Sequence, residues 1–344
     1  VTGHTGFKGS WLCRILLGLG AEVYGYALPP AQPSLYRLAK LGGVRSVFGD
    51  VRDRAALERA FREAEPQIVF HLAAQPIVRE GYRAPAYTYE TNVLGTVNLL
   101  ECVRKCGGVR SVVNVTTDKV YRELSAGTAA GSGRAQAYAE GDALGGPDPY
   151  SCSKSCSDLI AQSYAQSFFA NGETRVSCVR SGNALGGGDF APCRILPDCV
   201  RAALAGEPVR VRNPQSLRPY QHVLDALSAY LLVAQKQWER AELAGEYNAG
   251  PDESVPTGEI ASLFCEQWGG VRWLAEGEEN APREADGLLL DNAKIKRVLG
   301  WRPRFSAAEA VGMTVEWAKI WRSGGDTASF MDGQIARLFA KRGE

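Results

Sequence analysis

Hydrophobic residues in the first half of the chain occur in short continuous runs rather than in strict alternation with polar ones. Runs rich in Val, Ile and Phe occupy residues 21–27, 44–50, 67–74, 111–117 and 175–182. A strand covered on both faces of a parallel sheet has this composition, whereas a strand with one solvated face alternates. The pattern therefore predicts buried parallel strands over these residues.

Segments with the helical spacing of apolar residues separate these runs. They cover residues 7–19, 54–64, 92–106 and 150–170, and Asp53 is expected to cap the second of them. Strands that alternate with helices in this order predict an α/β fold built on a doubly wound parallel (Rossmann) sheet.

The rhythm changes after about residue 186, where glycine and proline become denser. Short strands are predicted over 208–213 and 245–250, the latter rejoining the main sheet, and helices over 222–240, 257–267, 292–298 and 306–322. We predict two domains. The sheet domain comprises 1–185 plus about 217–249, and a smaller, discontinuous substrate domain comprises 186–216 plus about 250–344.

The chain begins VTGHTGFKG, with glycines at 3, 6 and 9 before a helix. Glycines at such a turn let the backbone approach a pyrophosphate at the helix N-terminus, so the turn predicts a dinucleotide site in the first domain. A strand normally precedes a turn of this kind, and we expect further strand residues before Val1. The expected cofactor contacts are Gly3, Thr5, Gly6, Phe7, Gly9, Asp50, Val51, Leu72, Ala73, Ala74 and Asn92, with Tyr150 and Lys154 described below.

Two features bear on which dinucleotide binds. Asp50 ends a strand where a carboxylate can accept a hydrogen bond from an adenine amino group, with Val51 on the ring; the alternative is that Asp50 caps the next helix. An acidic residue after the strand at 21–27 marks NAD, but GYALPPAQPS contains none. NAD is the expected cofactor, and NADP stays open.

The candidate chemistry lies at VTTDKVY (115–121) and PYSCSK (149–154). The first follows a strand, and the carboxyl ends of parallel strands face the ligand crevice. Tyr150 and Lys154 lie one helical turn apart, so the ammonium is expected to lower the pKa of the phenol. Tyr150 then becomes a general base for an alcohol proton, with Thr117 bonded to the same hydroxyl.

These segments, with AAQP at 73–76 and TN at 91–92, resemble the extended short-chain dehydrogenase/reductase family that acts on nucleotide sugars. The stretches GHTGFKGSWL, IVFHLAAQPIVR, SGNALGGGDF and RNPQSLRPYQHVLDAL are similar to its branch of CDP-glucose 4,6-dehydratases. The resemblance implies a hydro-lyase of deoxysugar biosynthesis, such as that of lipopolysaccharide O-antigen. A homodimer is the family expectation, with helices 92–106 and 150–170 as candidates for the interface. The scattered cysteines, expected to be reduced thiols, favour a cytoplasmic protein.

In that branch the reaction is an internal redox cycle that uses NAD. Tyr150 takes the proton of the sugar 4-hydroxyl, and hydride leaves carbon 4 and later returns to carbon 6. Asp118 is the implied acid for the departing 6-hydroxyl, with a pKa raised by burial. Lys119 is the implied base at carbon 5; the alternative is that it stabilises an enolate or pairs with Asp118.

The resemblance also names substrate contacts, and arginines suit the diphosphate of a nucleotide sugar. The expected contacts are Gln75, Asn183, Arg194, Arg218, His222 and Arg283, although His222 alternatively orients the Arg218 loop or starts its helix. The chain departs from the branch at 125–137, where small residues replace a tryptophan-rich stretch. This departure affects how the sugar is expected to fit, because the segment lies near the sugar in the implied fold.

Composition narrows the remaining alternatives. With 39 basic and 38 acidic residues, nothing favours nucleic acid or a membrane surface. Nine scattered cysteines and three histidines do not predict a metal site, and reduced thiols are expected. Another nucleotide-sugar 4,6-dehydratase or a 4-epimerase remains an alternative, although the Asp118–Lys119 pair argues against the epimerase. A non-catalytic dinucleotide-binding protein is the third possibility.

Overall fold

A twisted parallel sheet forms the centre of the computed structural model, which describes residues 1–123, 137–277 and 287–340. Its order is β2 (Val44–Phe48), β1 (Val23–Ala27), Thr2, β3 (Ile68–His71), β4 (Ser111–Thr117), β5 (Arg175–Ser181) and β10 (Glu246–Ala249). Thr2 makes parallel bridges to Tyr26 and His71, so the first residues of the chain join the two halves. The predicted α/β parallel sheet is confirmed, and β10 rejoins it as expected.

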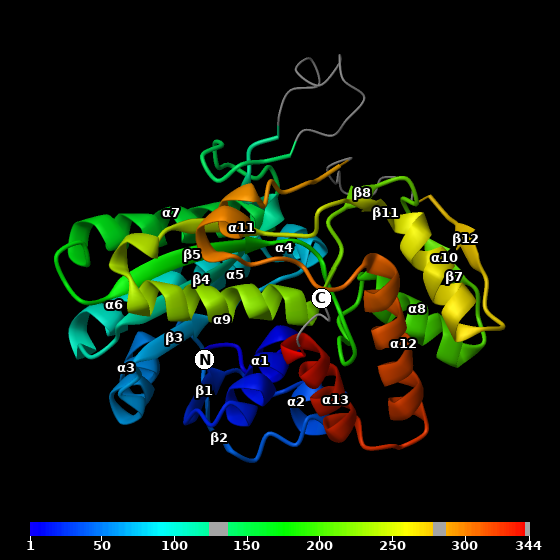
Figure 1. Cartoon of the computed structure of the whole chain (residues 1–344), viewed down its shortest axis with the longest axis horizontal. Coiled ribbons are helices and arrows are strands. Elements are labelled where there is room, and N and C mark those ends of the chain that lie inside the picture. Colours follow the sequence, from blue (N-terminus) through cyan, green and yellow to red (C-terminus); the bar gives the residue numbers. More distant parts are fainter. Residues whose placement is uncertain (124–136, 278–286, 341–344) are drawn as a thin grey trace.

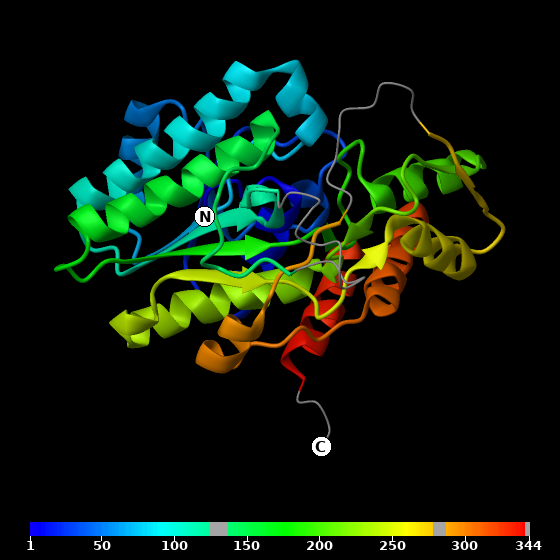
Figure 2. The same ribbon diagram turned by 90° about the horizontal axis from the view of Figure 1, so that it is seen from above.

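Helices cover both faces of this sheet (Figures 1 and 2). On one face lie α3 (Arg54–Ala64), α6 (Gly95–Cys106) and α7 (Pro149–Phe168), and on the other α1 (Phe7–Gly18) and α9 (Val223–Glu239), with α13 (Thr327–Phe339) packed on α9. Successive residues of β4 serve opposite cores, because Val112 packs with the α6–α7 side and Val113 with the α1–α9 side. This two-sided burial explains why the strands appear as continuous apolar runs.

A third group of buried residues lies apart from the sheet, on the right in Figure 1. It is formed by α8 (Ile195–Ala205), α10 (Thr257–Trp268), α12 (Ala307–Arg322), β7 (Val209–Val211) and β12 (Trp273–Ala275). Two short pairs connect it to the sheet: β6 (Ala184–Leu185) with β9 (Gln221–His222), and β8 (Leu217–Arg218) with β11 (Val255–Pro256). The two-domain division stays a prediction, which this separate core favours.

Several helices differ from the sequence expectation. The segment before the expected helix at 92–106 already contains α4 (Val78–Arg83), α5 (Pro85–Tyr89) and a π-helical turn, Glu90–Leu94. Short helices interrupted by Pro85 give too few turns for a clear periodicity. We did not expect α8 or α13, in which Pro197 and Gly333 obscure the helical pattern. The remaining elements are α2 (Leu35–Leu38), α11 (Ala293–Leu299) and the 3-10 turns Asp118–Val120 and Ala241–Leu243.

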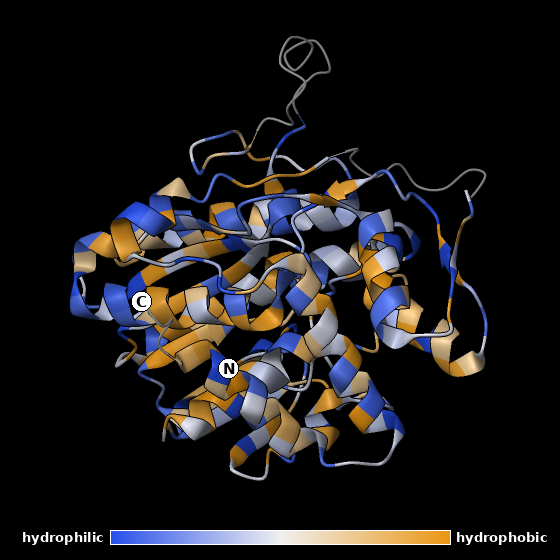
Figure 3. Cartoon of the chain, turned by 45° about the vertical axis from the view of Figure 1, so that its right-hand side comes forward, coloured by the Kyte–Doolittle hydropathy of each residue, from blue (hydrophilic) through white to orange (hydrophobic). Residues whose placement is uncertain are grey.

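The surface helices are amphipathic, with blue and orange bands along the same helix in Figure 3. In α3, for example, Leu57 and Phe61 are buried, and the Asp53 side chain accepts from the Ala56 N–H at 3.0 Å, which confirms the expected cap. None of the helices in the described part of the chain is long and apolar enough to cross a bilayer. The same residues contain no group of three or more side chains suited to holding a metal ion.

Candidate active site

A cavity of about 1010 Å³ opens at the carboxyl ends of β3, β4 and β5. Its walls include Leu72, Thr117 and Asn183, which end or follow these strands, and Tyr150 from α7. The third core contributes the far wall through residues of β7 and the loop that follows it. The cavity is therefore the crevice that the topology of an open α/β sheet predicts.

The glycine turn forms one end of this cavity. Gly3 has φ +74°, and a Cβ there would lie 2.8 Å from the Ala73 nitrogen, while a Cβ on Gly9 would lie 2.1 Å from the Gly3 carbonyl oxygen. Only glycine fits at these two positions. Gly6 precedes α1 without any side-chain cap, so the positive end of the helix dipole faces this turn. These features fit the pyrophosphate of a dinucleotide.

The structure places nearly all the expected cofactor contacts on the cavity wall. These are Gly3, Thr5, Gly6, Phe7, Gly9, Asp50, Val51, Leu72, Ala73, Ala74, Tyr150 and Lys154. The Asp50 carboxylate is paired with Arg52 at 2.7 Å, and these hydrogen bonds lower the pKa of Asp50. Because Asp53 caps α3, the alternative that Asp50 is the helix cap is wrong.

Tyr150 and Lys154 are positioned by the start of α7. Asp148 caps the helix by accepting from the Ser151 N–H at 3.0 Å, and the Lys154 Nζ donates to the Val115 carbonyl at 2.7 Å. Burial, with a smaller effect from Lys8, lowers the pKa of Lys154 to about 8. Lys8 lies in the glycine turn and donates to the hydroxyls of Ser181 and Tyr230.

The pKa of Tyr150 differs from the sequence expectation. Burial raises it to about 12, although a side-chain hydrogen bond with Thr117 and the charge of Arg194 act in the opposite direction. Asp118 adds a further increase. The protein without bound ligands therefore does not lower the pKa of Tyr150 as expected. Removing the phenol from water raises this pKa by more than the nearby positive charges lower it.

The segment Thr117–Asp118–Lys119, which we call the catalytic turn, ends β4 and enters a single 3-10 turn. The Thr117 hydroxyl donates to Asp118 Oδ1 at 2.8 Å. Asp118 is 1% exposed, and its Oδ2 has no hydrogen-bond partner among the described residues. Thr117 and Lys119 line the cavity, and Asp118 lies close enough to Tyr150 to affect its pKa.

Three of the expected substrate contacts reach the cavity, namely Asn183, Arg194 and Arg218. Arg194 is paired with Asp189 at 2.8 Å, and Arg218 is 3% exposed. Arg283 lies outside the described residues, as does nearly all of the small-residue stretch 125–137.

The side chains of three other expected contacts are buried and do not line the cavity, so their contacts with a ligand stay predictions. The Asn92 side chain accepts from the Gln75 N–H at Oδ1, and its Nδ2 donates to the Gln75 carbonyl and to the Ser153 hydroxyl. The Gln75 side chain donates to the Thr88 hydroxyl and accepts from the Ile77 N–H. His222 accepts from the Leu224 N–H and starts α9, which was the alternative role considered for it.

Sequence reasoning missed several cavity residues. Lys8, Ser216, Tyr220 and Thr257 all line the cavity, and the Ser216 Oγ is buried without a partner among the described residues. Lys8 was visible as a charge inside the glycine turn. The other three have no local pattern, since only tertiary packing joins the loop at 216–220 to the start of α10.

Comparison with known proteins identifies related sequences and folds. Residues 1–314 match the family described as GDP-mannose 4,6-dehydratase. The CDP-glucose 4,6-dehydratase of Salmonella typhimurium is 45% identical over 339 residues, covering 95% of this chain and 91% of that protein. The NAD complex of Thermus thermophilus UDP-glucose 4-epimerase has a TM-score of 0.79 at 28% identity and covers 92% and 97% of the two chains. Streptomyces venezuelae dTDP-glucose 4,6-dehydratase with NAD bound has a TM-score of 0.75 at 26% identity. That similarity covers 95% of this chain and 98% of the other.

Proposed function

Because the chain belongs to the GDP-mannose 4,6-dehydratase family, we propose that it is a CDP-glucose 4,6-dehydratase. It would convert CDP-glucose to CDP-4-dehydro-6-deoxyglucose and water. The observation that carries the proposal is the similarity to the Salmonella enzyme over nearly the whole chain. It is combined with Thr117, Lys119 and Tyr150 on the wall of one cavity and the buried Asp118 close to Tyr150.

NAD is the proposed cofactor, and the similarity of this chain to solved structures that contain NAD supports this. The glycine turn with the N-terminus of α1 would hold the pyrophosphate, and Asp50 with Val51 would face the adenine. Bound NAD would accept the hydride from carbon 4 of the sugar and return it to carbon 6.

Tyr150 would remove the proton from the sugar 4-hydroxyl. With a pKa of about 12 it is a poor base at neutral pH, so further positive charge near the phenol is needed. The nicotinamide ring of an oxidised cofactor carries such a charge. Thr117 lies beside Tyr150 and would orient the same hydroxyl.

The 4-ketone acidifies the proton on carbon 5, and elimination then needs a base and an acid. Lys119 lines the cavity and would take the proton. Asp118 accepts from Thr117 at Oδ1 and has no partner at Oδ2 within residues 1–123, 137–277 and 287–340; it would donate a proton to the departing 6-hydroxyl. The substrate diphosphate would pair with Arg194 and Arg218, both of which face the cavity.

The test is incubation of the protein with CDP-glucose and NAD, with the product followed by mass. Loss of one water is expected, and Tyr150→Phe and Lys119→Met should each abolish it, because each variant removes the group that accepts a proton. Loss of water from a dTDP- or GDP-sugar instead would preserve the mechanism and reject the base preference. A change in sugar configuration without loss of mass would indicate an epimerase.

We also propose a cytoplasmic homodimer that supplies a deoxysugar, for example for an O-antigen. The outward faces of α5, the π-helical turn and α7 carry the exposed apolar side chains Tyr89, Leu94 and Leu159. Tyr89 lies beside Cys152 of α7, and α5 and the π-helical turn both pack against α7, so these apolar side chains belong to neighbouring elements. A second copy of the same face would cover them.

A further inference from the structure

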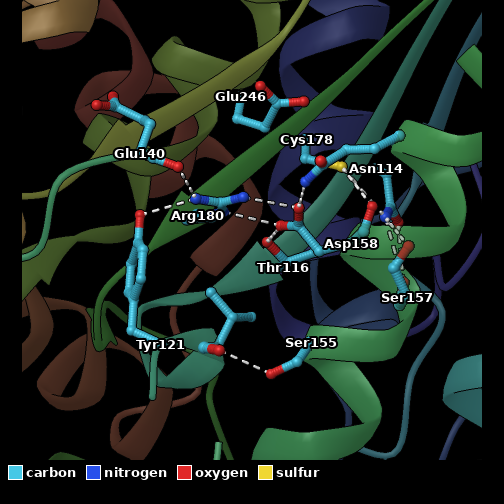
Figure 4. Close-up of polar contacts among 12 residues, drawn as sticks. Asn114, Thr116, Tyr121, Glu140, Ser155, Ser157, Asp158, Cys178, Arg180 and Glu246 are labelled. Atoms are coloured by element: carbon cyan, nitrogen blue, oxygen red, sulfur yellow. Dashed lines mark hydrogen bonds and ion pairs between the residues drawn. The ribbon is translucent and has the colours of Figure 1, made fainter. Parts of the chain in front are cut away.

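Two buried charges lie behind the cavity and have no part in the mechanism above. Arg180 of β5 and Asp158 of α7 have side chains that are 1% and 0% exposed. The guanidinium binds both carboxylate oxygens, with Nε at 2.9 Å and Nη2 at 2.8 Å (Figure 4). Removing two charges from water is costly, and such a pair persists only when its other hydrogen-bonding positions are also satisfied.

The remaining positions of this pair are satisfied by residues on either side of the catalytic turn. Asp158 Oδ2 accepts from the Thr116 hydroxyl at 3.0 Å, and Thr116 immediately precedes Thr117. Arg180 Nη1 donates to the Tyr121 hydroxyl at 2.9 Å, and Tyr121 follows two residues after Lys119. Figure 4 shows Thr116 and Tyr121 approaching the pair from different sides.

Asp158 of this pair belongs to α7, the helix that carries Tyr150 and Lys154. Asp158 lies four residues after Lys154 on α7, and Ser155 of this helix donates to the Val120 carbonyl at 2.7 Å. Both ends of the catalytic turn are therefore fastened to α7, through Thr116 at one end and through Val120 and Tyr121 at the other.

A second set of contacts extends this network beyond the turn. The Tyr121 hydroxyl donates to Asn248 Oδ1 at 2.6 Å, and its ring stacks on Tyr138 with centroids 4.9 Å apart. Asn248 Nδ2 donates to the Tyr138 carbonyl, and Arg180 Nη1 donates to the carbonyl of Glu140. The chain that leaves the turn at Tyr121 and the chain that returns at Tyr138 are thus held together at one place.

We propose that Arg180 and Asp158 are positioning residues that hold the catalytic turn in register with Tyr150 and Lys154. The inference rests on the proposed function. It assigns no chemical step to the pair: Tyr150 would act at carbon 4, while Asp118 and Lys119 would act at carbons 5 and 6 of the same sugar. The two groups come from different elements, and the buried pair fixes the spacing between them.

The first test uses the double variant Arg180→Met with Asp158→Leu, which removes both charges together and leaves neither unpaired. We expect NAD affinity within about 3-fold of wild type and an unchanged KM, but a kcat about 100-fold lower, the size of loss that a displacement near 1 Å produces. Reduced nicotinamide should also accumulate during a single turnover, because oxidation at carbon 4 would outrun elimination.

A milder variant keeps the inference testable if the double variant does not fold. Tyr121→Phe retains the ring stack and the ion pair but removes the hydroxyl between Arg180 and Asn248. Here we expect about a 10-fold lower kcat with the same accumulation of reduced nicotinamide. A structural role alone would lower thermal stability without changing the ratio of reduced cofactor to product.

The matched control is Gln237→Met. Gln237 is 1% exposed, accepts from the Ser177 hydroxyl of β5 and donates to the Ser111 hydroxyl, at the opposite end of the strands from the catalytic turn. It should lose stability and keep kcat. The inference is overturned if the Arg180→Met, Asp158→Leu double variant and Tyr121→Phe fold, bind NAD and turn over at the wild-type rate. If the wild type itself releases no water from CDP-glucose, the proposed function fails instead.

Discussion

Lys154 is a buried lysine whose surroundings disfavour the positive charge of its ammonium group. Its pKa is lowered from 10.5 to about 8, chiefly by burial and then by Lys8. Below pH 8 both the folded and the unfolded chain carry the proton, so the folded state bears the whole cost of the buried charge. Between pH 8 and 10.5 the unfolded chain still binds the proton that the folded chain has lost, so the free energy of unfolding rises with pH.

The variant Lys154→Met lacks this titration and gives the measurement. We expect the free energy of unfolding of wild type, relative to the variant, to increase by up to about 3 kcal/mol between about pH 7 and about pH 11. Urea unfolding at several pH values checks this. Parallel profiles for the two proteins would contradict it.

Residue identities were thus easier to predict than their electrostatics. The spacing of Tyr150 and Lys154 was sufficient to nominate the pair, and both reach the cavity. The expected low pKa of Tyr150 depended on a neighbouring charge, but burial raises it to about 12, and the degree of burial is a property of packing. The side chains of Gln75, Asn92 and His222 lie outside the cavity lining, which also depends on packing, since each is hydrogen-bonded to neighbouring main-chain groups.

At the scale of elements, the N-terminus of α7 decides where the chemistry lies. Tyr150 is the second residue of this helix, and Asp148 is its cap. Asp148→Ala should cost about 1 kcal/mol of stability, as caps usually do, and should lower kcat about 10-fold because Tyr150 shifts with the first turn.

Asp53→Ala is the control for this variant. Asp53 caps α3 in the same way, and neither Asp53 nor α3 lines the cavity. It should lose a similar amount of stability in urea unfolding and keep kcat. Equal effects of the two variants on kcat would contradict the special role of the α7 cap.

Elements with a regular pattern were predictable, and irregular ones were not. The β-rich runs and the long helices match the structure to within a few residues, because a buried strand and an amphipathic helix each leave a periodicity in the chain. The helices α8 and α13 pack onto the third core and onto α9, and their apolar positions make sense only beside those partners.

For the whole molecule, the sequence indicated the open α/β sheet with its crevice but not what surrounds the catalytic residues. Arg180 appeared only as one more residue of a buried strand. Its partners Tyr121 and Asp158 are 59 and 22 residues away in sequence, so no local pattern connects them. The far wall of the cavity, which includes Ser216 and Thr257, could not be predicted from the sequence for the same reason.

The surface formed by α5, the π-helical turn and α7 carries the last prediction. Tyr89, Leu94 and Leu159 are 36%, 54% and 52% exposed, and a stable monomer rarely leaves large apolar side chains grouped in this way. If two copies bury this face, Leu94→Glu with Leu159→Glu should weaken the dimer by about 100-fold or more, since each places a charge in an apolar interface. Light scattering over a range of concentrations measures the mass.

Leu274→Glu with Phe339→Glu is the matched control. These side chains are also exposed, at 41% and 52%, but lie on β12 and α13, away from that face. The control should remain dimeric, whereas the double variant at Leu94 and Leu159 should become monomeric. Because the cavity is lined within one chain, the monomer should still bind NAD. A monomeric wild type, or equal dissociation in both variants, would show that this face is not the interface.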